Sequence, residues 1–243
     1  MTVLDRSAIA VSSATITAVF ELNLMRSKPE GTVVVATSTR TLFRLWLPTV
    51  FGASMLVAEI PLVAASAARS AAGGQALAAI GIGVAILVVI NTPALAITPQ
   101  VATEQGRRVQ RQLWRYSVAV GLIGSIALLA LAVPPGSTGL NALFNLDPAV
   151  ADAVSAFLLG LAPNSFAVAI RRYLHGRLIH ARHTAPIIWA TLVRIAVTGA
   201  VAWVGVALWP GHGPLIAGCA LSLGAFLEAA SHMPSRSSSP SQP

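Results

Sequence analysis

Long apolar runs alternate along this chain with short polar segments. Six runs are apolar over roughly 20 residues, the length that crosses a bilayer as an α-helix. They cover residues 42–67, 75–97, 117–133, two runs on either side of the basic segment 171–184 within 149–209, and 215–230. In the third run, Gly121, Gly124 and Ser125 form a small-residue face suited to close helix packing. The pattern predicts an all-α protein, a polytopic transmembrane bundle of six spans.

The charges between the runs predict the orientation of the bundle. Residues 134–152, between the third and fourth runs, contain Asp147 and Asp152 and no Lys or Arg. Short loops rich in Lys and Arg remain in the cytoplasm, so we expect a multi-pass protein of the cell inner (plasma) membrane with both termini cytoplasmic. Only Arg69 disagrees with this arrangement. The arginines interpreted as orientation charge are Arg107, Arg108, Arg111, Arg115, Arg171, Arg172, Arg177 and Arg182.

The composition supports lipid as the solvent of the chain. Hydrophobic residues make up 55% and charged residues 10% of the 243 positions, with a mean hydropathy of +0.74. Such a chain cannot bury its apolar side chains in one soluble core. The net charge of +8 would suit nucleic acid in a soluble protein, but orientation charge explains it here, and we expect no nucleic-acid partner. Cys219 is the single cysteine, which leaves no disulfide framework.

Three segments follow from these patterns. Residues 1–41 are expected to be a cytoplasmic N-terminal segment, partly disordered, and residues 42–230 the transmembrane bundle. Residues 231–243 are rich in Ser and Pro and predict a disordered cytoplasmic tail.

Charged residues inside the spans are the first candidates for function. Each costs about 2.5–3.5 kcal/mol at a helix centre unless it has a partner or water. At 1.5 Å per residue, Glu59 lies roughly 22 Å and Arg194 roughly 15 Å from the inner side, so an ion pair between the first and fifth spans is within reach. The carboxylate either binds a proton, a cation or a substrate group in exchange for Arg194, or forms a permanent structural pair. Glu228, roughly 8 Å deep, is expected to reach water.

Two asparagines add a polar element at similar inner depth. Asn91 and Asn164 each lie close to a proline, which frees a backbone carbonyl. Such broken helices can line a transport cavity, and interhelical hydrogen bonding is equally consistent. The histidines His175, His180 and His183 lie in the basic segment without nearby carboxylates, so we expect no metal site.

Signatures of soluble enzymes are missing from the sequence. Gly81 and Gly83 have no third glycine and no preceding strand, and no Gly-Lys-Thr or Gly-Lys-Ser phosphate loop is present. No Ser, His and Asp set converges on one predicted face. We therefore expect no catalytic residues, no enzyme and no cofactor, with H+ or Na+ as the coupling ion of a transport process.

Residues 143–197 carry a recognisable motif. It has a Leu-Phe pair, a short start that contains proline, a proline in mid-helix and an Arg, Gly, Leu pattern at the inner turn. Its positions are Leu143, Phe144, Pro148, Pro163, Arg172, Gly176 and Leu178. Residues 143–197 thereby resemble the fourth and fifth helices of the multidrug and toxic compound extrusion (MATE) transporters and the wider multidrug/oligosaccharidyl-lipid/polysaccharide flippase superfamily. Residues 58–70 and 76–97 resemble the first helix pair of the branch that includes the progressive ankylosis protein and its bacterial relatives, and Arg194 resembles its fifth-helix arginine.

This resemblance implies a MATE-like N-terminal half and a secondary transporter. The function implied is efflux or antiport of an organic solute, anionic or drug-like, by alternating access. Glu59 would be the ion or substrate carboxylate and Arg194 its counter-ion, while Asn91 and Asn164 would line the cavity. The family has two six-helix bundles and this chain supplies one, which implies a homodimer or a second transporter half. His180 to His183 also replace a glycine of the family at the end of the inner turn.

Two alternatives remain open at this point. A lipid-linked glycan flippase would need several cations facing the cavity, where the sequence indicates only Arg194. A non-transporting membrane scaffold or degenerate half would leave Glu59 and Arg194 dispensable.

Overall fold

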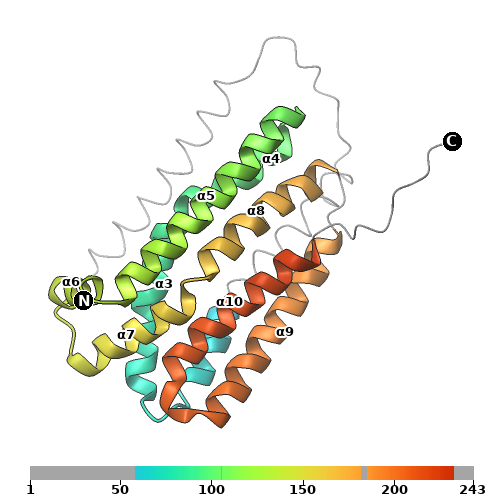
Figure 1. The fold of residues 1–243 in the computed structure, drawn as a ribbon. Helices are drawn as coiled ribbons and strands as arrows, with labels where there is room; N and C mark the ends of the chain where they lie inside the picture. The colour runs from blue at the N-terminus through green and yellow to red at the C-terminus, as the bar shows by residue number, and fades with distance from the viewer. Residues whose placement is uncertain (1–57, 105, 182–184, 233–243) are drawn as a thin grey trace, which may run out of the picture. The chain divides into compact units, whose positions relative to one another are not determined.

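The computed structural model of the chain describes residues 58–104, 106–181 and 185–232. This part of the chain is helical and contains no strand, which confirms the all-α prediction (Figure 1). A short helix, Ala58–Ala67, comes first. The elements that follow are α3 (Gly73–Leu95), α4 (Ile97–Thr103), α5 (Arg107–Ala132), α6 (Gly136–Phe144), α7 (Pro148–Leu161), α8 (Asn164–His180), α9 (Ala185–Leu208), the 3-10 turn η1 (Pro210–His212) and α10 (Gly213–Ser231).

Five helical segments are long and apolar enough to cross a membrane. They are Gly73–Thr103, Arg107–Ala132, Pro148–His180, Ala185–Leu208 and Pro210–Ser231. Large apolar side chains point outward from them: Val89, Ile123 and Trp189 are 72%, 66% and 70% exposed. Such outward apolar faces suit contact with lipid and describe a multi-pass membrane protein. Residues 42–57 of the first expected span lie outside the described part, so the count of six stays a prediction.

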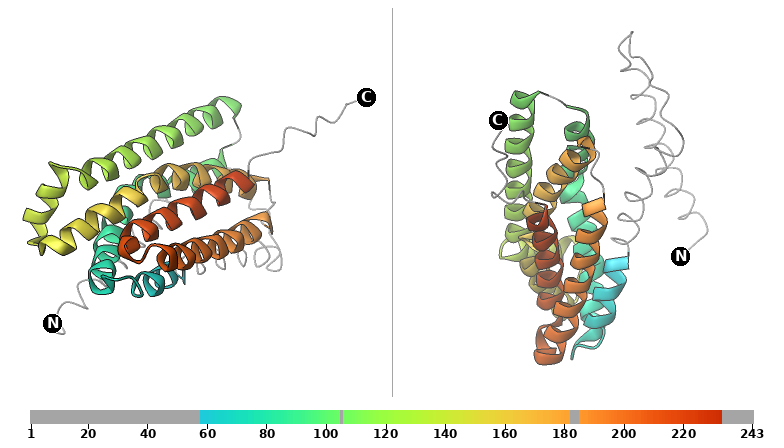
Figure 2. Two further views of the ribbon diagram at one scale, coloured as in Figure 1. Left: turned by 60° about the horizontal axis from the view of Figure 1, so that its bottom comes forward. Right: turned by 90° about the vertical axis from the view of Figure 1, so that its right-hand side faces the viewer.

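The pair α7 and α8 forms the centre of the bundle. In the apolar part of Pro148–His180, 67% of the residues are buried, whereas the corresponding share in Gly73–Thr103 is 22%. Figure 2 shows α8 between α5 and α10. The chain breaks between α7 and α8 at Ala162 and Pro163, as a proline without an N–H group requires. Helix α10 supplies polar partners at this break, as membrane-depth breaks need.

Those partners are side chains and backbone groups at hydrogen-bond distance. Asn164 Nδ2 donates to the carbonyl of Leu221 at 3.0 Å, and Ser222 Oγ donates to the carbonyl of Gly160 at 2.8 Å. The interhelical bond of Asn164 is therefore one of the two roles that the sequence left open for it.

Glycines bring the helix backbones together on both sides of this centre. A Cβ atom on Gly160 would lie 2.5 Å from the carbonyl oxygen of Leu215 in α10. On α5, the predicted small-residue face packs against α8: Gly121 meets Phe166 and Gly124 meets Ser165. Phe166 N donates to Ser125 Oγ at 3.2 Å. That expectation is confirmed, since each of the three small residues touches the neighbouring helix.

The basic segments are helical where the sequence predicted loops. Residues 98–103 belong to α4 and 107–116 to α5, so only residues 104–106 separate the two helices. Residues 171–180 likewise continue α8. Arginine and glutamine are good helix formers, so a helix continues past its apolar part instead of ending there. On the opposite side, Asp147 caps α7 by accepting the amide hydrogen of Ala149 at 2.9 Å.

Candidate functional site

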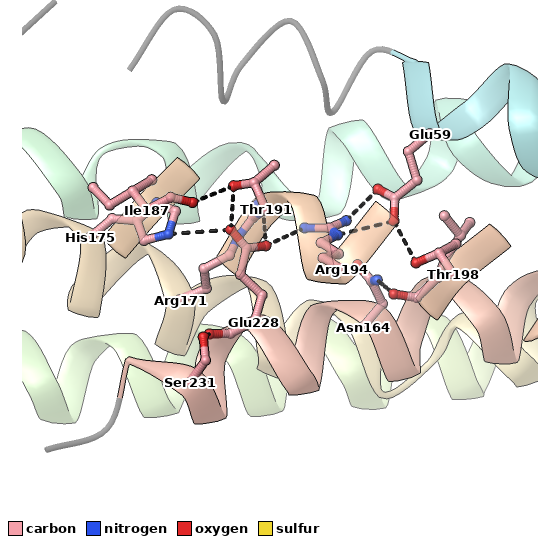
Figure 3. Close-up of polar contacts among 11 residues, drawn as sticks. Glu59, Asn164, Arg171, His175, Ile187, Thr191, Arg194, Thr198, Glu228 and Ser231 are labelled. Atoms are coloured by element: carbon pink, nitrogen blue, oxygen red, sulfur yellow. Dashed lines mark hydrogen bonds and ion pairs between the residues drawn. The ribbon is translucent and has the colours of Figure 1, made fainter. Parts of the chain in front are cut away.

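A chain of buried charges runs through the bundle. Glu59 lies on the first described helix, Arg194 on α9, Glu228 on α10 and Arg171 on α8. Figure 3 shows their side chains pointing toward one another, with Arg194 between the two carboxylates. Their exposed fractions are 2%, 5%, 1% and 4%. The first described helix and the three consecutive helices α8, α9 and α10 are therefore joined by buried side chains of opposite charge.

The pair of Glu59 and Arg194 has bidentate geometry. Arg194 Nε donates to Glu59 Oε1 at 3.0 Å and Arg194 Nη2 donates to Glu59 Oε2 at 2.6 Å. Thr198, one turn along α9, donates its hydroxyl to Glu59 Oε1 at 2.9 Å. The ion pair expected from helix depth is present, and its planar fork is the strongest form of an Arg–carboxylate contact. Its role in binding a substrate or ion stays a prediction.

Glu228 is a second anchor of the same chain. Its Oε2 accepts hydrogen bonds from Arg171 Nη1 at 2.8 Å and Arg194 Nη1 at 3.0 Å. Its Oε1 accepts one from Thr191 Oγ1 at 3.1 Å. The expectation that Glu228 reaches water is wrong, because α10 turns this side chain inward toward α8 and α9, where two guanidinium groups neutralise it.

The interpretation of Arg171 as orientation charge in a loop is wrong. Arg171 is buried within α8 and paired with Glu228. A signal for this was available: Arg171 and Glu228 each directly follow an apolar stretch and carry opposite charges. Two such residues on neighbouring spans are natural partners in lipid.

Two histidines stand next to Glu228. His175 Nε2 lies 3.4 Å from Glu228 Oε1, and the rings of His175 and His232 pack edge to face with centroids 5.0 Å apart. The expectation that the histidines of the basic segment lack a carboxylate is therefore wrong for His175. Ligand atoms of the three residues lie within 4.8 Å of one another. A divalent cation there would also face the guanidinium groups of Arg171 and Arg194, whose positive charges disfavour a metal ion at this cluster.

The charge of His232, at the end of α10, follows from this packing. Burial, followed by the neighbouring His175, lowers the pKa of His232 from its ordinary value of 6.5 to about 4. This imidazole is therefore neutral at physiological pH.

A groove runs along the buried charges. It has a volume of about 260 Å³ and an apolar side formed mainly by α3. All four residues singled out from the sequence line it: Glu59, Asn91, Asn164 and Arg194. Residues distant in sequence are thus brought to one concave surface, the arrangement expected of a small-molecule site.

Arg171 and Arg172 line the same groove, so Arg194 is not its only cation. The sequence expectation on this point is wrong. Within the described residues, Arg172 makes no ion pair, and its buried Nε has no hydrogen-bond partner. The lining therefore holds three guanidinium groups against the single carboxylate of Glu59, or against two carboxylates when Glu228 behind Arg194 is counted. The surplus is positive.

Comparisons with protein-family models, with curated proteins and with solved structures found no match for this chain. The resemblance to MATE-like transporters therefore stays a prediction. The helices describe a polytopic membrane protein with five candidate spans, and the groove gathers Glu59, Arg171, Arg172 and Arg194 from helices of this bundle.

Proposed function

We propose that this chain is a secondary transporter of MATE-like type that moves an organic anion across the plasma membrane by alternating access. It would work with both termini inside, as a homodimer or together with a second transporter half. The observation that carries the proposal is the positive surplus in the groove, where Arg172 is unpaired among the described residues beside the network of Glu59, Arg194 and Glu228.

An unpaired cation within a span favours a binding site for an anion. Placing a guanidinium in a span is costly, and the cost is usually offset by a counter-charge or by water. Glu59 and Glu228 are already engaged by Arg194 and Arg171. A carboxylate or phosphate group on the solute would supply the missing negative charge to Arg172, with the bidentate geometry that guanidinium groups favour.

Exchange of partners offers a way to couple binding to movement. Arg194 divides its donors between Glu59 and Glu228, which lie on different helices. A solute anion or a proton that replaces one of these contacts weakens the tie between those helices. The break before Asn164 gives α7 and α8 a place to reorient relative to one another. The coupling ion in this scheme is H+ or Na+, with Glu59 as its carboxylate.

Flux through reconstituted protein tests the proposal. Proteoliposomes are loaded with carboxyfluorescein, an organic anion, or with ethidium, an organic cation, and protein-dependent release is measured. We expect release of the anion at least about tenfold faster than that of the cation. Arg172→Gln is expected to lower anion flux at least tenfold without unfolding, since no described carboxylate depends on it. Arg115→Gln, which removes an exposed arginine outside the groove, is the matched control.

The flux results distinguish a solute-binding role of the buried charges from a purely structural one. If Arg172→Gln, Glu59→Gln and Arg194→Ala all transport as well as wild type, the groove is not the solute site. If wild type releases neither dye while it remains folded, the account of a non-transporting scaffold is favoured and the proposal fails.

A lipid-linked glycan flippase is the second candidate, favoured by one observation. That function needs several cations facing the cavity, and Arg171 and Arg172 join Arg194 in the lining. A fluorescent polyprenyl diphosphate sugar, reduced by dithionite only in the outer leaflet, distinguishes the two. Protein-dependent flipping without carboxyfluorescein release would replace the soluble-anion proposal by this one.

A further inference from the structure

A second cavity lies between the first turns of α5 and the last turns of α8. Its volume is about 520 Å³, twice that of the groove. Three arginines line it, Arg107 and Arg111 from α5 and Arg177 from α8, together with the aromatic rings of Trp114 and Tyr173. The two helices lie side by side in Figures 1 and 2. Neither the charge network nor the proposed solute site uses these residues.

The cavity faces a different side of α8 from the groove. At 3.6 residues per turn, Tyr173, Leu174 and Arg177 cluster on the side roughly opposite to the groove residues of α8. A ligand in this cavity therefore would not contact Arg172 or Arg194, and the two sites can be tested independently.

The charge in this cavity has no internal counterpart. Arg107 and Arg111 lie one turn apart on α5 and share a face that looks toward Arg177 on α8. No carboxylate lines the cavity, and within the described residues none of the three arginines forms an ion pair. Facing like charges repel one another across a shared cavity, and a bound anion removes this repulsion.

The other end of the cavity is aromatic. Trp114 and Tyr173 pack edge to face with ring centroids 5.1 Å apart, and the Tyr173 hydroxyl donates to the carbonyl of Gln110 at 3.4 Å. Trp114 follows Arg111 by about one turn, directly before the apolar stretch that starts at Ser117. Tryptophan and tyrosine favour this boundary between headgroups and hydrocarbon. The cavity thus has arginine side chains at one end and aromatic side chains with polar groups at the other.

We propose that this cavity binds the headgroup of an anionic phospholipid. The phosphate would take bidentate hydrogen bonds from the guanidinium groups, and the glycerol and acyl chains would continue past Trp114 into the hydrocarbon. Basic pockets between spans at the cytoplasmic side are suited to such headgroups, and the inner leaflet carries the anionic lipid. The orientation of the protein in the membrane explains why arginines are present on this side. It does not explain why three of them line one cavity together with the packed rings of Trp114 and Tyr173.

A charge-matched pair of variants tests the proposal. Arg107→Gln/Arg111→Gln removes two arginines of the cavity. Arg108→Gln/Arg115→Gln removes two arginines of the same helix that are exposed like Arg107 and Arg111 but lie about a fifth of a turn away, outside the cavity. Both variants keep the same net charge. Native mass spectrometry of each detergent-solubilised protein is carried out with phosphatidylglycerol, with phosphatidylethanolamine and with glycerol phosphate.

We expect wild type and the Arg108/Arg115 control to bind phosphatidylglycerol equally, and the Arg107/Arg111 variant about 30-fold more weakly. Binding of phosphatidylethanolamine is expected to be weak in all three proteins. Equal losses in both variants would show that net charge, not this cavity, attracts the lipid. Tight binding of glycerol phosphate alone would identify a soluble phosphate site. Either result overturns the proposal.

Tryptophan quenching locates the lipid. Vesicles that contain dibrominated phosphatidylglycerol quench tryptophans whose rings touch the brominated chain. The difference in quenching between wild type and Trp114→Phe measures the quenching of Trp114 itself. We expect this difference to disappear when the same comparison is made in the Arg107→Gln/Arg111→Gln background. A difference that is unchanged by that replacement contradicts the cavity as the binding site.

Discussion

Replacing Arg194 by glutamine removes the centre of the buried charge chain. Glu59 then loses two of its three hydrogen bonds and its only charged partner among the described residues. Glu228 loses one contact but keeps Arg171 and Thr191. The damage is therefore expected at Glu59, which is 2% exposed and forms its ion pair with Arg194.

The magnitude follows from the asymmetry of the network. Leaving one member of a buried pair without its partner costs about 3–5 kcal/mol, which is the destabilisation expected for Arg194→Gln. Glu59→Gln is expected to cost less, about 1–3 kcal/mol, because Arg194 retains Glu228. In the double variant both charges are gone, so Glu59→Gln should restore at least half of the stability that Arg194→Gln removes.

Unfolding in detergent mixed with increasing SDS, followed by helical circular dichroism, measures these free energies. The cycle is repeated with Glu228→Gln in place of Glu59→Gln, and this second cycle is expected to show less recovery. A cost below about 1 kcal/mol for Arg194→Gln would refute the reasoning. So would equal recovery by Glu59→Gln and Glu228→Gln, since it would mean that Arg194 serves both carboxylates alike.

Three further predictions concern packing, pH and capping, and each is read from thermal unfolding in detergent. Gly218→Ala places a methyl group against a backbone carbonyl of α7 and should cost about 1–3 kcal/mol, whereas Gly81→Ala, with nothing within 4 Å, should be neutral or stabilising. His232, with its pKa lowered from 6.5 to about 4, binds a proton more readily when unfolded, so stability should fall as pH is lowered from 6.5 to 4, and should fall less in His232→Gln. An identical dependence of stability on pH in both proteins argues against the partly buried position of His232. Asp147→Ala removes the cap of α7 and should cost about 1 kcal/mol, and a change near zero would mean that the cap is not formed in solution.

Periodicity and depth were sufficient for much of the fold and for one ion pair. Apolar runs predict membrane helices because backbone groups in lipid have few alternatives, and five of the expected runs coincide with long apolar helices. Depth along two helices sufficed to pair Glu59 with Arg194, because unpaired charges are costly there.

The errors share one physical origin. The apolar pattern predicts loops or water for residues near the ends of spans, although helices continue past the apolar stretch and their sides face each other. Arg171 and Glu228 were therefore missed as partners, and Arg172 as part of the groove. Sequence position shows how deep a residue lies but not which side of its helix faces inward, and only the packing of α8, α9 and α10 determines that.

The central claim is that the groove is reached alternately from the two sides of the membrane, and cysteine labelling tests it without knowledge of the solute. Asn91→Cys is made in a Cys219→Ser background, with Val89→Cys, which points outward, as the control. A charged, membrane-impermeant thiol reagent is applied to vesicles of each orientation. Alternating access predicts that the cysteine at position 91 reacts from both sides and the one at position 89 from neither. Reaction of position 91 from one side alone, or from none, would contradict the account.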